Sequence, residues 1–354
     1  MLKQMTIKNL TVFQEETLHF APGLNVIIGE NGSGKSHLLK AAYAAMAASA
    51  EEARRPGGNG PTKTVLQKTY AEKFINVFRP ESLGRLVRKR QGRERCELGF
   101  VFDDHKKSCQ FGFASASKTE VQIETLPGAW ETQAPVFLPT RELLTLYPGF
   151  VPMYESRYLE FEETWRDTCL LLGAPALRGP GEKKAAELLR PLQEAMGGNV
   201  ILDTNGRFYL KRPGQGTMEM SLVAEGLRKL AMLARLIGTG SLLDKGYLFW
   251  DEPESNLNPR LVKMVARVIL ELCNNGIQVF VATHSLFLLR ELSIISCDAR
   301  FKKMTQRYLA LTRETSASDI VVEQGSTIDE LNTLVLLDEE LAQSDRYMDS
   351  EEMG

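Results

Sequence analysis

Short runs of apolar residues recur along this chain and predict strands that are buried in a sheet. The clearest are Leu24–Ile28, Tyr247–Trp250 and Val279–Ala282, and each ends at a glycine or at polar residues. Runs this short and this apolar are typical of parallel strands that are covered on both faces. Because they alternate with stretches of helical periodicity, the pattern predicts an α/β fold around a mixed or parallel sheet.

Other segments predict an antiparallel β subdomain near the N-terminus. Strands are expected at residues 2–7 and 16–20, the second of which alternates apolar and polar residues before Pro22-Gly23. A loop is expected at residues 55–63, which are rich in glycine and proline. Further strands, the first two of them forming a hairpin, are expected at 98–103, 109–113, 121–125 and 135–138.

Apolar residues spaced three and four apart predict the helices. The spacing is regular over Glu155–Leu172 and Glu182–Ala195, which are expected to form a helical lobe. After that lobe, the turn signal Asp203–Gly206 separates two short strands, 200–202 and 207–210. Further helices are expected at 37–48, 224–238 and 261–274.

The last part of the chain predicts a helix and a frayed tail. Residues 328–341 have the pattern of an amphipathic helix, which serves either core packing or the docking of a partner. The acidic segment Asp338–Glu352 has few apolar residues after Leu341, so we expect it to be frayed.

Composition and charge narrow the class of protein. The chain has 354 residues, of which 43 % are hydrophobic and 25 % charged, and its formal net charge is −2, so nothing global points to nucleic acid. Its five cysteines lack metal-ligand or disulfide spacing, which indicates reduced thiols in a cytoplasmic protein. The most apolar long stretch, Leu227–Leu243, contains Arg228, Lys229 and Arg235, so no membrane span or membrane partner is expected.

The most informative motif is Gly-Glu-Asn-Gly-Ser-Gly-Lys-Ser at residues 29–36, which fills the pattern G-x-x-x-x-G-K-[ST] completely. It lies between a predicted strand and a predicted helix, as a phosphate-binding loop requires. Its glycines let backbone N–H groups surround a triphosphate, and the N-terminus of the helix favours the same anion. Lys35 is expected to reach the β- and γ-phosphates, and Ser36 to ligate Mg²⁺. The candidate nucleotide contacts are Gly29, Glu30, Asn31, Gly32, Ser33, Gly34, Lys35, Ser36 and His37.

Two further strand ends supply candidate catalytic groups. Tyr247–Trp250 runs into Asp251 and Glu252, and an open α/β sheet places its ligand at the carboxyl ends of its strands. We expect Asp251 to hold Mg²⁺ and Glu252 to act as general base toward the attacking water. His284 follows the strand Val279–Ala282 and is expected to contact the γ-phosphate, a structural histidine being the alternative.

Together these motifs resemble the ABC-type ATPase heads of the RecF, SMC and OLD group, most of all the compact stand-alone AAA-type ATPases that accompany bacterial anti-phage and toxin–antitoxin effectors. The resemblance is carried by the run from Ile7 to Ser36, by Asp251–Glu254 as Walker B segment, by Ser255–Leu257 as D-loop and by His284 as switch histidine. It implies a P-loop NTPase fold of ABC-ATPase type that binds ATP and Mg²⁺.

The resemblance also implies that the whole chain is one such head. The expected parts are lobe I with the phosphate loop and the β subdomain (1–140), an inserted helical lobe and hairpin (141–223), the segment with signature helix, Walker B and switch histidine (224–312), and a C-terminal segment with an acidic tail (313–354).

In such heads a nucleotide lies between the phosphate loop of one subunit and the signature helix of another, which implies a head-to-tail ATP-sandwich dimer or a higher homo-oligomer. The signature candidates are Ala224, Glu225 and Gly226, together with Asn256 of the D-loop. The usual serine falls on Ala224, so one hydroxyl donor to phosphate is missing, and Ser221 is a candidate substitute. The loss of one such donor would cost the closed dimer on the order of 1–3 kcal/mol.

For three features the sequence leaves two interpretations open. The Q-loop falls either at Gln133 or at Arg141, and we favour Arg141 because a guanidinium at a strand end suits phosphate. Phe13 either stacks on adenine or packs in the core. The run Arg85–Arg95 has six positive charges in eleven residues and is either a DNA contact or a solvated strand edge.

The function that these motifs favour is an ATP-hydrolysing switch that dimerises around ATP and controls a separate effector protein, such as a nuclease, in bacterial defence. Its turnover is expected to be slow and gated by a partner or by DNA. The alternative is a RecF-like DNA-binding ATPase of DNA repair. A transporter ATPase subunit is disfavoured by the altered signature and by the RecF-like N-terminus.

Overall fold

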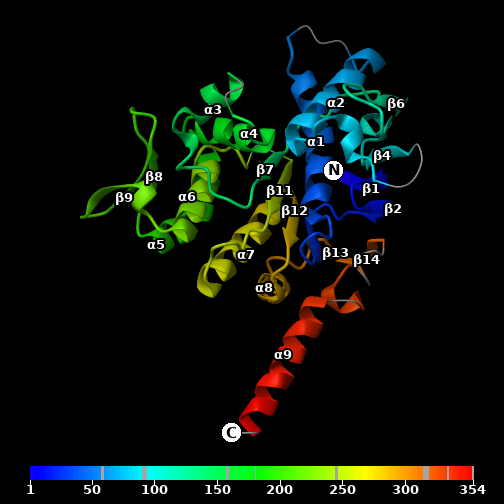
Figure 1. Cartoon of the computed structure of the whole chain (residues 1–354). Helices are drawn as coiled ribbons and strands as arrows, with labels where there is room; N and C mark the ends of the chain where they lie inside the picture. The colour runs from blue at the N-terminus through cyan, green and yellow to red at the C-terminus, as the bar shows by residue number, and fades with distance from the viewer. Residues whose placement is uncertain are drawn as a thin grey trace.

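The computed structural model describes residues 1–56, 60–89, 94–156, 159–179, 181–243, 246–313, 319–332 and 335–352. Within these ranges the chain forms three β-sheets with helices packed around them (Figure 1). The central sheet has six strands in the order β14-β13-β3-β12-β11-β7, and only the edge strand β14 is antiparallel to its neighbour among these described strands. Their bounds are β3 Leu24–Gly29, β7 Val136–Leu138, β11 Tyr247–Asp251, β12 Gln278–Thr283, β13 Gln306–Thr312 and β14 Val321–Gly325.

The three apolar runs in the sequence form β3, β12 and β11, side by side in the middle of this sheet, so this prediction is confirmed. In the parallel register Asp251 lies opposite Ala282, and Thr283 lies opposite Ile28. The carboxyl ends of the three strands therefore meet at one edge, where the chain continues into the phosphate loop, the Asp-Glu pair and His284.

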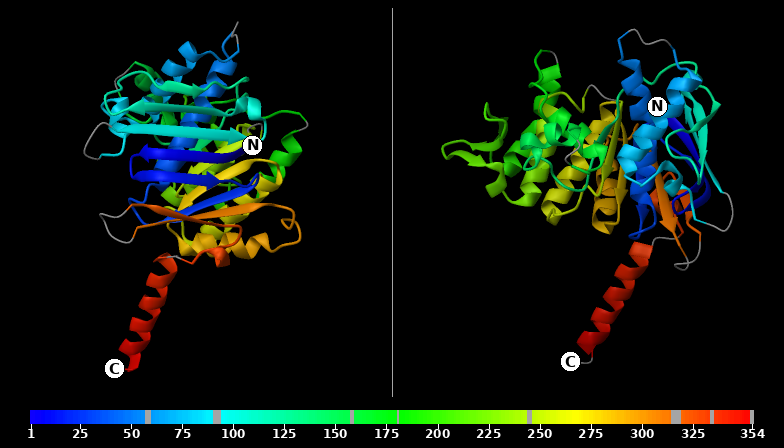
Figure 2. Two further views of the ribbon diagram at one scale, coloured as in Figure 1. Left: turned by 90° about the vertical axis from the view of Figure 1, so that its right-hand side faces the viewer. Right: turned by 45° about the horizontal axis from the view of Figure 1, so that its top comes forward.

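A second sheet is antiparallel, in the order β2-β1-β4-β5-β6, and is the β subdomain that the sequence predicts. Figure 2 shows its strands side by side in the left view. The bounds are β1 Leu2–Leu10, β2 Phe13–His19, β4 Arg95–Phe102, β5 Cys109–Ala114 and β6 Gln122–Thr125.

Helix α1, Lys35–Ala53, lies between these two sheets and is buried around most of its circumference. One hydrophobic cluster joins its alanines to Phe111 of the antiparallel sheet and to Phe249 and Phe280 of the central sheet. The small alanine side chains let both sheets approach the helix closely, which fixes the direction in which its N-terminus points. Helix α2, Lys63–Phe78, packs beside α1 and was not predicted.

The other face of the central sheet is covered by helices α6 Glu225–Gly238, α7 Pro259–Asn274 and α8 Leu286–Ser296. The helical lobe beyond them contains α3 Tyr147–Glu155, α4 Glu163–Leu172, α5 Gly181–Met196 and a small sheet of β8 Asn199–Leu202, β9 Phe208–Arg212 and β10 Gly216–Glu219. Short 3₁₀ turns complete the described elements at Leu83–Leu86, His105–Lys107, Met220–Leu222 and Ile328–Glu330. No described helix is both long enough and apolar enough to cross a membrane.

Two helical predictions are wrong in extent. The expected helix Glu155–Leu172 is interrupted, because α3 ends at Glu155 and α4 begins only after Glu162, whose backbone is extended (φ −63°, ψ 140°). The expected helix 328–341 is likewise not continuous, since Leu331 is extended between a 3₁₀ turn and α9. Helical periodicity alone did not reveal either break.

The acidic tail is a helix rather than a frayed segment, which corrects the prediction for Asp338–Glu352. Helix α9 runs over Val335–Glu352 and extends away from the rest of the molecule (Figure 1). Its leucine, glutamate, glutamine and arginine residues have high intrinsic helix propensity, so the segment is helical while most of its described side chains are exposed.

Candidate nucleotide-binding site

The phosphate loop connects β3 to α1 as the motif predicts. Gly32 and Gly34 adopt left-handed backbone conformations (φ 81° and 96°), which favour glycine. A Cβ at Gly34 would lie 2.7 Å from ring atoms of Phe13, so the loop rests directly on that ring. Phe13 is fully buried, so it packs in the core and stacking on adenine is excluded.

Lys35 already fills the loop with its ammonium group. Its Nζ donates hydrogen bonds to the carbonyl oxygens of Gly29 (2.8 Å) and Glu30 (2.9 Å). Burial lowers the pKa of Lys35, while the carboxylates of Glu252 and Asp251 act in the opposite direction. An anion that enters the loop would therefore meet the Lys35 ammonium, which the two carbonyl oxygens hold in place and whose positive charge is only partly neutralised.

Asp251 and Ser36 lie together beneath the same loop. Asp251 is buried, and burial raises its pKa, whereas a hydrogen bond from the Ser36 side chain lowers it. Within the described ranges, Asp251 Oδ1 and Ser33 Oγ are buried side-chain atoms without a hydrogen-bond partner. A buried carboxylate oxygen with a free lone pair, next to a hydroxyl, is the donor set that Mg²⁺ takes in proteins, so these residues fit the ion.

Glu252 and His284, which are 32 positions apart in the sequence, are in direct contact. His284 Nδ1 lies 3.0 Å from Glu252 Oε1, and the Ser255 hydroxyl donates to Glu252 Oε2 at 3.0 Å. The Glu252 side chain remains 24 % exposed, so a water molecule can reach the carboxylate while two neighbours orient it. The structure thus brings together the two residues that the sequence nominated for catalysis.

Glu254 is a buried residue whose importance the sequence analysis missed. Its Oε1 accepts a hydrogen bond from the Thr283 hydroxyl at 2.5 Å, which ties the end of β11 to the end of β12. Burial raises the pKa of Glu254. A glutamate two residues after the Asp-Glu pair was visible as part of the motif, but the sequence does not indicate its partner.

The first turn of α6 lies against the D-loop of the same chain. Ala224 is the N-cap and makes no side-chain capping bond, as expected from its methyl group. Asn256 Nδ2 donates to Glu225 Oε1 at 2.9 Å. A Cβ at Gly226 would lie 2.7 Å from the Asn256 carbonyl oxygen, so glycine permits this close approach.

The two Q-loop candidates lie at opposite ends of the central sheet. A Cβ at Gly246, just before β11, would lie 2.0 Å from Gln133 Oε1, which places Gln133 at the amino end of the strands. Of the two candidates, Gln133 therefore lies at the end of the strands away from the phosphate loop, which disfavours it as the Q-loop. Arg141 follows β7 at the carboxyl edge and is exposed, and its neighbour Glu142 is buried with Oε1 3.0 Å from Arg228 Nε.

The ring of His37, the last residue of the predicted phosphate-loop contacts, lies against the turn between β1 and β2 and against α2. Its Nδ1 lies 3.0 Å from the Thr11 hydroxyl, and its ring centroid is 5.7 Å from that of Phe78. Burial lowers the pKa of His37, which favours the neutral imidazole. A contact with the nucleotide remains a prediction.

The basic run is largely paired where the structure describes it. Arg85 pairs with Glu81, Arg88 with Asp319, and Arg95 with Glu97 and Glu124. Arg90 and Arg93 lie outside the described residues. These ion pairs favour a salt-bridged surface over a bare phosphate-binding patch. The expected strand edge is wrong, because Arg95 begins β4, which pairs with β1 on one side and β5 on the other.

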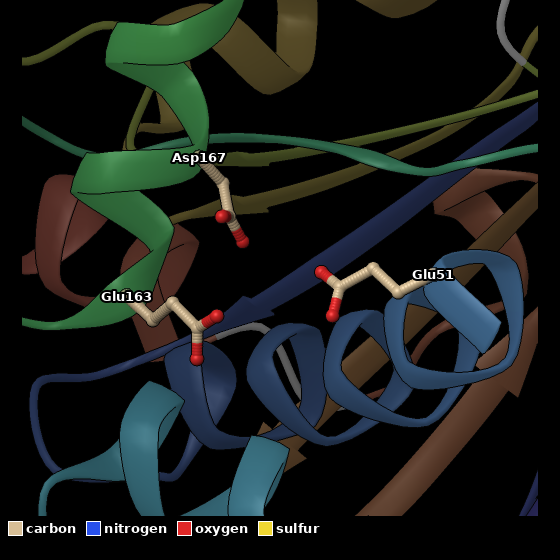
Figure 3. A group of neighbouring side chains, drawn as sticks. All are labelled: Glu51, Glu163 and Asp167. Carbon is tan, nitrogen blue, oxygen red and sulfur yellow. The ribbon is translucent and has the colours of Figure 1, made fainter. Parts of the chain in front are cut away.

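A second group of carboxylates lies away from the phosphate loop. Glu51 from α1 and Glu163 and Asp167 from α4 point toward one another, with oxygens within 4.8 Å (Figure 3). The Lys73 ammonium is bonded to all three, at 2.5, 3.1 and 2.9 Å respectively. Because the Lys73 ammonium already forms ion pairs with all three carboxylates, we interpret the group as an ion-pair network that joins α1, α2 and α4. A cavity of about 390 Å³ between α1 and α4 adjoins it, lined partly by Glu51 and Asp167.

Comparison with known proteins gives two family matches. Residues 101–290 match the model of a family described as AAA domain, putative AbiEii toxin, Type IV TA system. Residues 4–123 match a second AAA-domain model. The DNA replication and repair protein RecF of Geobacillus kaustophilus is 45 % identical over 42 residues, which span 12 % of this chain and 11 % of that relative.

Two solved structures share the fold. One is an SmcHead bound to the C-winged helix domain of ScpA, with a TM-score of 0.55, 14 % identity, and coverage of 91 % of this chain and 97 % of that one. The other is an Smc head domain with an extended coiled coil bound to the C-terminal domain of ScpA, derived from Pyrococcus furiosus. Its TM-score is 0.52, with 11 % identity and coverage of 98 % and 99 %. At these identities the likeness establishes the fold alone.

Proposed function

This chain belongs to the AAA-domain family described as putative AbiEii toxin, Type IV TA system, and from that premise we propose that it is an ABC-type ATPase head of the RecF/SMC group. We propose that it binds and hydrolyses ATP as a molecular switch. The observation that carries the proposal is the meeting of three strand ends. They bring Lys35, Asp251 and a Glu252–His284 pair to one edge of the central sheet.

Each residue has a distinct part in the proposed reaction. Lys35 exchanges its loop carbonyls for oxygens of the β- and γ-phosphates. Ser36 and Asp251 hold Mg²⁺, which when bound neutralises charge on the triphosphate. Glu252 accepts a proton from water as the water oxygen bonds to the γ-phosphorus and the bond to the β–γ bridging oxygen breaks, giving ADP and phosphate. His284 holds the Glu252 carboxylate toward that water.

We propose that ATP closes a head-to-tail homodimer, in which the turn Ala224–Gly226 of one subunit faces the nucleotide of the other. The N-terminus of α6 is suited to this because its backbone N–H groups and helix dipole favour an anion. Ala224 offers no hydroxyl, so we expect the closed dimer to be weaker than one with serine at this position.

The effector is proposed to be a separate protein. Both Smc heads in the comparison are bound to a domain of another protein, ScpA, which shows that this fold can present a docking surface. We propose that the closed ATP dimer of this chain controls such a partner in bacterial defence. The second candidate, a RecF-like DNA-binding ATPase, is supported by the local match to RecF.

The experiment is phosphate release from ATP by the purified chain, with and without duplex DNA, with Glu252→Gln as the blank. We expect slow release by the wild type and none above background by Glu252→Gln, which should still bind ATP. Wild-type turnover in Glu252→Gln would disprove the general-base assignment. Strong stimulation by DNA would favour the RecF-like candidate, whereas indifference to DNA would favour control by a protein.

A further inference from the structure

Lys229 is a buried lysine that has no part in the reaction proposed above. It lies in the first turns of α6, is 3 % exposed, and shares its helix face with the buried Leu233 and Leu236. Buried ammonium groups are normally paired with a carboxylate. Here Nζ donates instead to two backbone carbonyls, that of Glu252 at 2.6 Å and that of Ser255 at 3.3 Å.

Those two carbonyls belong to the loop that carries the proposed general base. Glu252 and Asn256 both have left-handed backbone conformations (φ 46° and 62°), which are unfavourable for residues with a Cβ. The surroundings must hold such a conformation in place. Lys229 Nζ bonds carbonyl oxygens within this loop, while the Glu252 carboxylate keeps its own partners, His284 and Ser255.

Neighbouring contacts make the start of α6 and this loop one mechanical unit. Glu225 accepts a hydrogen bond from Asn256, and Gly226 lies against the Asn256 carbonyl. Arg228 pairs with Glu142, which follows β7 at the same edge. Any displacement of the first turns of α6 therefore acts on the backbone of Glu252 through Lys229.

We propose that Lys229 is a positioning residue that fixes the backbone of Glu252 and transmits movement of the α6 N-terminus to it. The inference rests on the proposed function and adds how the general base is held. In the proposed dimer, α6 faces the nucleotide of the other subunit. Lys229 then makes hydrolysis in one site depend on nucleotide in the other.

The test compares full-length wild type, Lys229→Met and Lys229→Arg. We measure the Kd of Mg·ATP by calorimetry and the steady-state release of phosphate against ATP concentration. Lys229→Met should keep Kd within about twofold but lose on the order of 10- to 100-fold in kcat, because the base is misplaced. For Lys229→Met, the dependence of the rate on ATP concentration should also become less cooperative and approach that of independent sites. Lys229→Arg should recover part of the rate.

Lys73→Met is the matched control, because it removes another buried lysine whose ion pairs are with α1 and α4 rather than with the Glu252 loop, and it should leave turnover per folded molecule unchanged. If Lys229→Met is poorly folded, Lys229→Gln, which keeps a neutral donor, replaces it. Wild-type kcat and steepness in the folded variant would overturn the inference, as would a fall in rate explained wholly by weaker ATP binding. Absence of phosphate release by the wild type would instead reject the proposed function itself.

Discussion

Single residues at the phosphate loop carry charges that burial opposes. Burial lowers the pKa of Lys35 and raises that of Asp251, so the polypeptide alone disfavours both charged forms. Phosphate oxygens next to Lys35 and a cation next to Asp251 would each favour the charged form. Nucleotide and Mg²⁺ would thus offset the free-energy cost of keeping Lys35 and Asp251 charged while they are buried. We therefore expect the two ligands to bind together.

Lys35→Ala is expected to weaken ATP binding by at least about 100-fold, or about 3 kcal/mol, because it removes a charge-assisted contact to phosphate. Calorimetric titration with Mg·ATP measures this. The control is Lys3→Ala, which removes an exposed lysine that pairs with Asp103 and should leave the Kd unchanged. A Lys35→Ala variant that binds ATP like the wild type would show that the loop does not hold the phosphates.

Among the elements, α6 is the one whose start departs from the pattern of its group. Ala224 forms the N-cap without a side-chain bond. Ala224→Ser should add about 1 kcal/mol to the free energy of unfolding through capping, and a further donor to phosphate in the closed dimer. In the Glu252→Gln background we expect the ATP-dependent dimer to dissociate about 5- to 10-fold less readily, as measured by light scattering over a dilution series.

Ala186→Ser is the control for that substitution, since it adds the same hydroxyl at an exposed position within α5, away from the start of α6. If Ala224→Ser raises thermal stability without ATP but leaves the dimer unchanged, then Ala224 caps a helix and does not face the nucleotide of another subunit.

A helix, strand or loop could be predicted from the sequence where a single property, such as apolar character or a glycine pattern, determines it. The apolar runs identified β3, β11 and β12 because both faces of each strand are buried, and the glycine pattern identified the loop between β3 and α1. Strand β13, Gln306–Thr312, was missed because its first two residues are polar and only part of it is buried. Helix α2 was also missed, although Leu66, Tyr70 and Phe74 repeat at helical spacing and are buried.

The position of the candidate site was predictable, but its internal contacts were not. The motif placed Lys35, Asp251, Glu252 and His284 correctly at one edge, because parallel strands must end together. The contacts of Lys229 could not be predicted, since the carbonyl partners of a lysine on an apolar helix face follow only from the three-dimensional structure. The same holds for Gln133, whose position depends on the direction from which the chain enters β7.

At the scale of the whole molecule, the helical lobe is joined to the sheet core by the Lys73 network as well as by apolar packing. Glu51 belongs to α1, Lys73 to α2, and Glu163 and Asp167 to α4. The Tyr43 hydroxyl of α1 also donates to Asp167 at 2.6 Å. Because these helices come from distant parts of the chain, the network contributes to the arrangement of the lobes rather than to any one helix.

Lys73→Met should therefore lower the free energy of unfolding by about 3–5 kcal/mol at pH 8, because it leaves three carboxylates together without their cation. Urea unfolding followed by circular dichroism measures the loss.

The loss of stability caused by Lys73→Met should be smaller at pH 5 than at pH 8. Burial already raises the pKa of Glu163, and removal of the ammonium raises it further above the value in the unfolded chain, so the folded variant binds more protons and gains stability as pH falls. In the wild type the pKa of Lys73 is raised, so its contribution to stability is complete at both pH values and is lost only above its unfolded pKa near 10.5.

The control is Lys3→Met, which breaks an exposed pair and should change stability by no more than about 0.5 kcal/mol at either pH. A Lys73→Met variant as stable as Lys3→Met, or equally destabilised at pH 5 and pH 8, would mean that apolar packing alone holds the lobes together.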